Sequence, residues 1–210
     1  MKALLLKDLL ILRRNGRHTL LFLVAYCVIF GLISQDAGMV GGISVMMLAT
    51  LSIGTFSYDN LAHWDSYALC LPVTRKQMVQ AKYLLALLST VAGGLLAAFL
   101  GLAIALIYRQ PLPTVGELLS IAGGLLGASV LLLSILLPLI YRFGVEKSRL
   151  IIIAVVGLPT LLIYLLVKLQ LPMPSVQAIE KMLWVLPVLL LALLAGSYLI
   201  SCRIFSRKEF

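Results

Sequence analysis

Long apolar runs alternate with short polar stretches along this chain. A hydrocarbon core about 30 Å thick needs roughly 20 apolar residues per helix, so uncharged runs of this length predict membrane-spanning helices. Six runs qualify, at residues 19–34, 39–56, 83–107, 118–140, 150–167 and 182–201. The pattern therefore predicts an all-α membrane protein in which a single transmembrane domain, residues 1–210, contains six spans.

Composition supports this fold class. Of the 210 residues, 62% are hydrophobic and 12% are charged, and the mean hydropathy is +1.10. Such a chain has too little polar surface to cover a soluble globule, so it must use lipid as part of its solvent.

The basic residues orient the predicted spans. All of the 17 lysines and arginines except Arg109, Lys168 and Lys181 fall on one side of the predicted membrane. Because Lys and Arg accumulate in cytoplasmic loops, this side is expected to be the cytoplasm and to hold both termini. The net charge of +9 is then an orientation signal and an attraction to anionic lipid, and it does not indicate a nucleic-acid partner.

Residues 1–17 are expected to form a helix in the membrane interface. The basic residues from Lys2 to Arg17 share one broad arc of this helix, and most of the apolar residues take the opposite arc. Asp8 falls on the apolar arc, where an unpaired carboxylate would be costly, so we expect it to pair with a cation of its own helix or a neighbouring segment. The helix is either a lipid anchor alone or an anchor that also contacts a cytoplasmic partner.

Two similar stretches of small residues mark places where helices can approach closely. AGGLLAA (92–98) lies in the third predicted span and AGGLLGA (122–128) in the fourth. Gly123 and Gly127 have G-x-x-x-G spacing, and Gly93 and Ala97 repeat the small-x-x-x-small pattern. We expect these two spans to pack against each other within one subunit, with a subunit interface as the alternative.

The polar segment 57–82 is expected to be a cytoplasmic loop with two helices. A short helix capped near Ser57 or Asp59 should end at Pro72, because proline disfavours a helical conformation in the residue before it. Thr74 and Gln77 match the S/T-x-x-E/Q capping box, which predicts a new helix that continues into the third span. The aromatic residues of this loop fit either a docking helix or a set of interfacial anchors.

Several kinds of site are absent from the sequence. No charged residue lies in the middle third of a predicted span, which disfavours a secondary carrier, and no G-x-x-x-x-G-K-[ST] loop is present to bind ATP. His18 and His63 lack the additional ligands of a zinc site, so we expect no catalytic and no metal site in this chain. Any active pumping must be powered by another chain.

The segment LPVTRKQMVQAKYL, residues 71–84, resembles the signature segment of bacterial type-2 ABC (ATP-binding cassette) transporter permeases. In the small members of that family, a W-x-x-Y-x-x-x-LP-[VI]-[ST]-R-x-x-[IV]-x-x-[SA]-KY pattern follows the second span. CLP stands here in place of the more usual Thr-Leu-Pro. The residues that match are Trp64, Tyr67, Leu71, Pro72, Val73, Thr74, Arg75, Ala81, Lys82 and Tyr83, and Val79 stands one position after the [IV] place.

The resemblance implies a homodimer or heterodimer of six-helix permeases in a bacterial cell membrane, each bound to a separate cytosolic ATPase that holds ATP and Mg²⁺. The loop helix would then be a coupling helix that docks on the ATPase. The candidate contacts are Asp59, Asn60, His63, Trp64, Asp65 and Tyr67, and the loop edge consists of Pro72, Thr74, Arg75 and Lys76. Trp64 is the preferred candidate, because buried aromatic residues dominate interface energetics.

The apolar spans suggest a hydrophobic or amphipathic cargo. We expect a permease subunit of an exporter for a secreted peptide, and the alternatives are export of a peptide antibiotic or of a lipid-like drug. Short outer loops disfavour an importer that receives its cargo from a binding protein. A secondary carrier and a non-transporting membrane scaffold remain as further alternatives. The segment 168–181 is a candidate re-entrant element, because the family's fold would suggest one.

Overall fold

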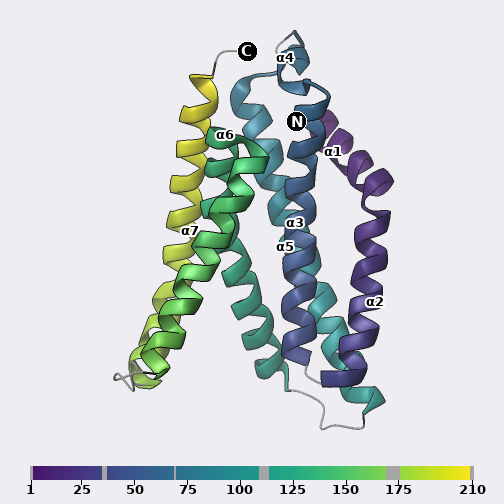
Figure 1. Ribbon diagram of the computed structural model, residues 1–210, viewed down its shortest axis with the longest axis vertical. Helices are drawn as coiled ribbons and strands as arrows, with labels where there is room; N and C mark the ends of the chain where they lie inside the picture. The colour runs from purple at the N-terminus through teal and green to yellow at the C-terminus, as the bar shows by residue number, and fades with distance from the viewer. Residues whose placement is uncertain (1, 35–36, 69, 109–113, 169–175, 209–210) are drawn as a thin grey trace.

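The computed structural model describes residues 2–34, 37–68, 70–108, 114–168 and 176–208 (Figure 1). Within this part of the chain every regular element is a helix, so the predicted all-α class is confirmed. The helices are α1 (Lys2–Asn15), α2 (Arg17–Ser34), α3 (Ala37–Leu61), α4 (Trp64–Ala68), α5 (Arg75–Ile107), α6 (Val115–Lys168) and α7 (Val176–Ser206).

Among the described residues, four helical stretches are long and apolar enough to cross a membrane. They are Val40–Leu61, Arg75–Ile107, Gly116–Ser148 and Pro187–Ser206, and the apolar helix Arg17–Gly31 is shorter. The first predicted span, which lies near the lower length limit, corresponds to this short helix. The count of six spans stays a prediction. Residues 35–36, between the first two predicted spans, lie outside the described residues. So does most of the candidate re-entrant segment, residues 169–175, and Val176 already belongs to α7.

α6 contains a reversal of the chain at Gly144. This residue has φ of 80° and ψ of 171°, a conformation that L residues with a side chain rarely adopt. In Figure 1 the chain rises through the first part of α6, turns back and descends through the second part, and α7 then rises beside it. The end of the bundle that carries α4 therefore also carries this turn, the start of α1 and the end of α7.

α3 and α5 pack closely because small residues face each other. A Cβ atom on Gly93 would lie 2.9 Å from the Val45 Cα atom, and one on Gly41 would lie 3.0 Å from the Ala97 Cβ atom. Residues 92–98 were predicted to approach another helix closely. That helix is mainly α3, which contains the second predicted span. In the fourth span Gly123 has open space around its Cβ position, although Leu126 does contact Gly94. The expected packing of the third and fourth spans within one subunit is therefore confirmed at Gly94. Gly93 of the same motif instead faces α3, and Gly123 makes no close approach.

The apolar core lies toward the α4 end of the bundle. Phe56 of α3, Tyr141 of α6 and Phe205 of α7 form an edge-to-face series, with ring centroids 5.3 and 5.4 Å apart. Leu137 and Phe205 are almost completely buried there. Aromatic edge-to-face contacts add about 0.5–1.5 kcal/mol beyond the buried area, so three helices are held together where α4 lies.

Candidate functional site

α4 follows a sharp turn at the end of α3. The last turn of α3 closes with bonds from Ala62 N–H to Tyr58 O (3.0 Å) and from His63 N–H to Asn60 O (3.2 Å). His63 then has φ of 47°, in the left-handed region that non-glycine residues enter mainly at turns. The predicted helix start near Ser57 or Asp59 is therefore wrong: α3 continues to Leu61, and the short helix begins at Trp64.

The capping box that begins α5 is present as predicted. Gln77 N–H donates to the Thr74 hydroxyl oxygen (3.3 Å), and Thr74 N–H donates to Gln77 Oε1 (3.1 Å). Each bond satisfies a backbone donor that has no partner within the helix. α5 then runs without interruption to Ile107. Thr74, just after the turn that follows α4, therefore caps a helix that is long and apolar enough to cross a membrane.

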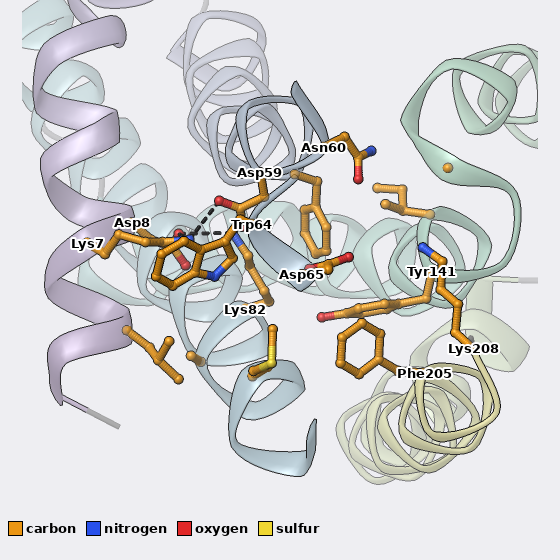
Figure 2. Close-up of a pocket in the computed structure, with 16 residues that line it drawn as sticks. Lys7, Asp8, Asp59, Asn60, Trp64, Asp65, Lys82, Tyr141, Phe205 and Lys208 are labelled. Carbon is orange, nitrogen blue, oxygen red and sulfur yellow. Dashed lines mark hydrogen bonds and ion pairs between the residues drawn. The ribbon is translucent and has the colours of Figure 1, made fainter. Parts of the chain in front are cut away.

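Four charged side chains from three helices form a buried network next to α4. Lys82 Nζ contacts Asp8 Oδ1 (2.9 Å) and Asp59 Oδ2 (2.6 Å) and donates to the Thr55 hydroxyl (2.9 Å). Lys7 Nζ contacts Asp59 Oδ1 (2.6 Å) and Asp8 Oδ1 (3.1 Å). Figure 2 shows these groups converging from α1, α3 and α5. We call Lys7, Asp8, Asp59 and Lys82 the charge network.

The charge network is neutral and well shielded from solvent. The side chain of Asp8 is 2% exposed, that of Asp59 8% and that of Lys82 10%. Two ammonium groups balance two carboxylates, and the three donors of Lys82 meet three acceptors. The expected pairing of Asp8 is confirmed, with partners on its own helix and on α5. A buried charge that loses its partner is costly, so the network ties α1, α3 and α5 together.

Trp64, the first residue of α4, covers one side of the charge network. Lys7 Nζ lies 4.3 Å from the centroid of the Trp64 ring, within the range of a cation–π contact. Trp64 also packs against Tyr67, with ring centroids 5.6 Å apart. The orientation of α4 is thus coupled to Lys7, and through Lys7 to both carboxylates.

A cavity of about 80 Å³ lies between α4, the charge network and the ends of α6 and α7. Asp65 and Trp64 line it from α4, and Tyr141, Phe205 and Lys208 line it from the opposite side (Figure 2). Burial raises the pKa of the Asp65 carboxyl above its ordinary value of 3.8, and the nearby Asp59 charge acts in the same direction. Lys208, Lys82 and Lys7 oppose that rise in the pKa.

Arg75 binds the C-terminal end of α7. One guanidinium nitrogen donates to the backbone oxygens of Phe205 (3.2 Å), Ser206 (2.7 Å) and Lys208 (3.0 Å). The last carbonyls of a helix lack intrahelical partners and carry a partial negative charge, so a cation there is favourable. The start of α5 is thereby fastened to the end of α7, and the hydroxyl of Tyr83 adds bonds to Ser197 and Ser201 one turn further in.

Comparison with known proteins identifies the family. A family model described as "ABC-2 family transporter protein" matches residues 3–206. The chain belongs to this family. It is therefore a type-2 ABC transporter permease and a multi-pass membrane protein, as the resemblance of residues 71–84 indicated. No curated protein and no solved structure matches.

Membership of the ABC-2 family defines the setting of this permease. Permeases of this family are typically non-enzymatic and work with a separate ABC ATPase, so such an ATPase is the implied partner. Among the described residues, no group of three or more His, Cys, Asp or Glu side chains is placed to hold a metal ion.

The candidate docking residues of the permease separate into two groups. Asp59 is buried in the charge network, and Trp64 and Asp65 are half-buried against it and the cavity. The side chains of Asn60, His63 and Tyr67 are exposed. At the loop edge, Pro72, Thr74 and Lys76 are exposed and Arg75 is half-buried at the end of α7.

Sequence reasoning did not predict that Lys7 and Lys82 join the charge network, or that Thr55 accepts a hydrogen bond from Lys82. Lys82 was counted with the loop cations that orient the chain, yet the fold buries it. One signal was visible in advance: Asp8 lies on the apolar arc of α1, and Lys82 lies where the third span begins. A second capping box was also missed, in which Thr114 and Glu117 exchange bonds of 2.9 and 3.4 Å at the start of α6.

Proposed function

We propose that this permease exports a hydrophobic or amphipathic cargo, preferably a peptide, and that α4 is its coupling helix. In this proposal the α4 end faces the cytoplasm of a bacterial cell and holds both termini. Two permease subunits form the transport path, and a partner ATPase that binds ATP and Mg²⁺ docks on each α4.

Exposed apolar side chains at the α4 end carry this proposal. Leu61 is 79% exposed and Tyr67 is 59% exposed, and Phe143 lies across from them in the turn of α6 with 43% exposed. Leu61 and Phe143 line an open groove of about 460 Å³, to which Asn60 and Lys147 add polar groups. Exposed apolar residues beside polar ones at the end of a bundle are typical of a protein-binding surface.

The inner side of α4 gives this surface a mechanical connection to the membrane. Trp64 covers Lys7, and Lys7 and Lys82 share both carboxylates of the network. A push on α4 therefore acts on α1, α3 and α5 together. α5 can carry the movement along its whole length, because it continues as one helix from Arg75 to Ile107.

An apolar groove at the opposite end of the bundle supports an apolar cargo path. It has a volume of about 360 Å³ and lies between α2, α3 and α5, where Val28, Leu96 and Leu100 are among the lining residues. Its lining consists of apolar and small residues together with Cys27 and Tyr108. Such a surface offers little to a sugar or an inorganic ion, and it fits hydrocarbon side chains or lipid-like groups.

Copurification with the partner ATPase tests the docking role of α4. Tyr67→Ala removes an exposed aromatic ring, and we expect it to weaken retention of the ATPase roughly 30-fold or more, as for an interface hot spot. Trp64→Ala should weaken retention as well and also loosen Lys7. Phe99→Ala is the matched control, because Phe99 is 67% exposed on α5, away from the α4 end. Unchanged retention with both α4 variants would contradict the docking assignment.

Transport by proteoliposomes containing the permease and its ATPase tests the cargo. We expect ATP-dependent movement of a labelled amphipathic peptide, and a peptide antibiotic or a lipophilic dye in its place would favour the corresponding alternative. Movement driven by an ion gradient without ATP would indicate a carrier. If the ATPase binds and hydrolyses ATP but none of these compounds moves, the result would favour a non-transporting scaffold.

A further inference from the structure

The elbow between α1 and α2 presents a group of cations without acidic partners. Arg13, Arg14, Arg17 and His18 are all exposed within six positions, on both sides of Gly16. No Asp or Glu occurs from Leu9 to Ser34, and among the described residues none of the three arginines has an ion pair. The charge of the elbow is therefore available to an anion from outside the chain.

Gly16 makes the elbow sharp. A Cβ atom at this position would overlap the carbonyl oxygen of Leu12, and Gly16 N–H donates to that same oxygen at 2.7 Å. Figure 1 shows α1 slanting outward from the bundle to the elbow, and α2 descending from it along α3. The cations thus lie at the side of the bundle, at the depth where the apolar helix Arg17–Gly31 begins.

A groove of about 150 Å³ lies at the elbow, lined by residues next to these cations in the sequence. Ile11, Leu12, Gly16 and Thr19 line it from the elbow, and α3 contributes the other wall. The α3 residues are Thr50, Leu51, Gly54 and Tyr58. Its surface mixes methyl and methylene groups with three hydroxyls, and it is open because nothing lies within 4 Å of the Cβ position of Gly54.

The position of the groove decides what kind of anion it can hold. Just beyond the cations, α2 exposes Leu20, Leu21 and Phe22, with Phe22 70% exposed, so the surface changes from cationic to apolar within two helical turns. A phospholipid has this same order of charge, polar linker and hydrocarbon. Basic pockets between helices at a membrane surface bind acidic lipid headgroups through charge and exclude neutral ones.

We propose that the groove between the α1–α2 elbow and α3 binds one anionic phospholipid of the adjoining leaflet. The phosphate group contacts Arg13, Arg14 and Arg17, the glycerol lies against the hydroxyls of Thr19, Thr50 and Tyr58, and an acyl chain follows the exposed side of α2. The bound lipid fills the space between the elbow and α3 and contacts both. This site involves neither α4 nor the cargo. Its test is therefore independent of the test of the proposed function.

Native mass spectrometry of the full-length protein tests the site, with phosphatidylglycerol and phosphatidylcholine of identical acyl chains as probes. We expect the wild type to retain one phosphatidylglycerol in preference to phosphatidylcholine. Changing Arg13, Arg14 and Arg17 together to Gln should lower the apparent affinity for phosphatidylglycerol about fivefold per arginine, about a hundredfold in all. The matched control changes three other exposed cations, Arg142, Lys147 and Arg207, to Gln, and it should keep the bound lipid.

A filled groove provides the second test. Gly54→Leu should reduce retention of the lipid at least tenfold, and Gly124→Leu is its control because Gly124 also has open space around its Cβ position. If Gly54→Leu fails to fold, Thr50→Leu fills the same groove from an exposed position.

Four outcomes would overturn the proposal. In the first, the wild type retains both lipids equally; in the second, the control triple variant loses as much phosphatidylglycerol as the triple arginine variant. In the third, glycerol 3-phosphate displaces the lipid completely. In the fourth, both groove-filling variants retain the lipid as the wild type does. A groove-filling variant that lowers the dimer fraction while the lipid count stays constant would assign the groove to a second protein copy instead.

Discussion

Lys82 Nζ of α5 lies 2.9 Å from Asp8 Oδ1 of α1, a residue 74 positions earlier in the chain. The same ammonium group lies 2.6 Å from Asp59 Oδ2 at the end of α3. α1, α3 and α5 therefore meet at one buried cation directly beside α4. If one of these helices moves alone, a buried charge loses a partner, so the three are expected to move together.

Loss of the central cation should destabilise the permease strongly. Lys82→Met leaves the two buried carboxylates with Lys7 as their remaining cation, and we expect a loss of about 3–5 kcal/mol in the free energy of unfolding. Thermal unfolding in detergent measures the effect. Lys76→Met is the control, because Lys76 is an exposed cation on the first turn of the same helix.

A compensating change separates charge from packing in that experiment. Lys82→Met combined with Asp8→Asn leaves Lys7 with Asp59, which are 2.6 Å apart. We therefore expect the double variant to recover a substantial part of the stability lost in the single variant. If the double variant is less stable than the single one by the full cost of Asp8→Asn alone, the two side chains are not coupled.

Arg75 should hold the end of α7 in place. Arg75→Ala removes three charge-assisted bonds to the carbonyls of Phe205, Ser206 and Lys208, and we expect about 1.5–3 kcal/mol of local stability to be lost. Hydrogen exchange of the last turn of α7 should accelerate accordingly. Arg75→Lys should restore part of the protection, because an ammonium group keeps the charge but not the planar geometry of the guanidinium. Equal exchange in all three proteins would show that the contact contributes nothing.

Removal of the capping box should weaken the start of α5. Thr74→Ala deletes the acceptor of Gln77 N–H, which should cost about 1 kcal/mol, the usual effect of a lost N-cap. Far-ultraviolet circular dichroism during thermal unfolding gives the comparison with the wild type. Thr50→Ala is a suitable control, since that hydroxyl is exposed and bonds to a carbonyl of its own helix. A change no larger than the control's would mean that the cap is dispensable.

Asp65 should make stability depend on pH. Its pKa is raised by burial in the folded protein, so the folded state holds this proton more tightly than the unfolded state does. The resulting stabilisation of the protonated form is lost as the pH rises from the ordinary value of 3.8 through the folded pKa. Asp65→Asn should therefore be at least as stable as the wild type at neutral pH, and the difference should vanish at low pH. Melting temperatures from pH 4 to 7 test this, and a gap that widens toward acid would contradict it.

The helices that depend on local patterns were predictable from the sequence. Thr74 and Gln77 are three positions apart, and their exchange of bonds needs no other part of the chain, so the start of α5 was placed correctly. The apolar runs likewise indicated an all-α membrane protein, because length and hydropathy are properties of each segment alone. The end of α3 was misplaced, since Asp59 was read as a cap although its carboxylate serves Lys7 and Lys82 inside the fold.

Sequence alone determined the class of protein, the start of α5 and the need for a partner at Asp8. Tertiary structure decided which cation that partner is, because Lys82 is brought to Asp8 only when α5 packs on α1. It also decided that Arg75 caps α7 and that Gly93 of α5 faces α3, since both contacts join segments far apart in the chain. Local patterns report backbone hydrogen bonding and hydropathy, whereas the pairing of buried charges depends on how the helices are arranged in space.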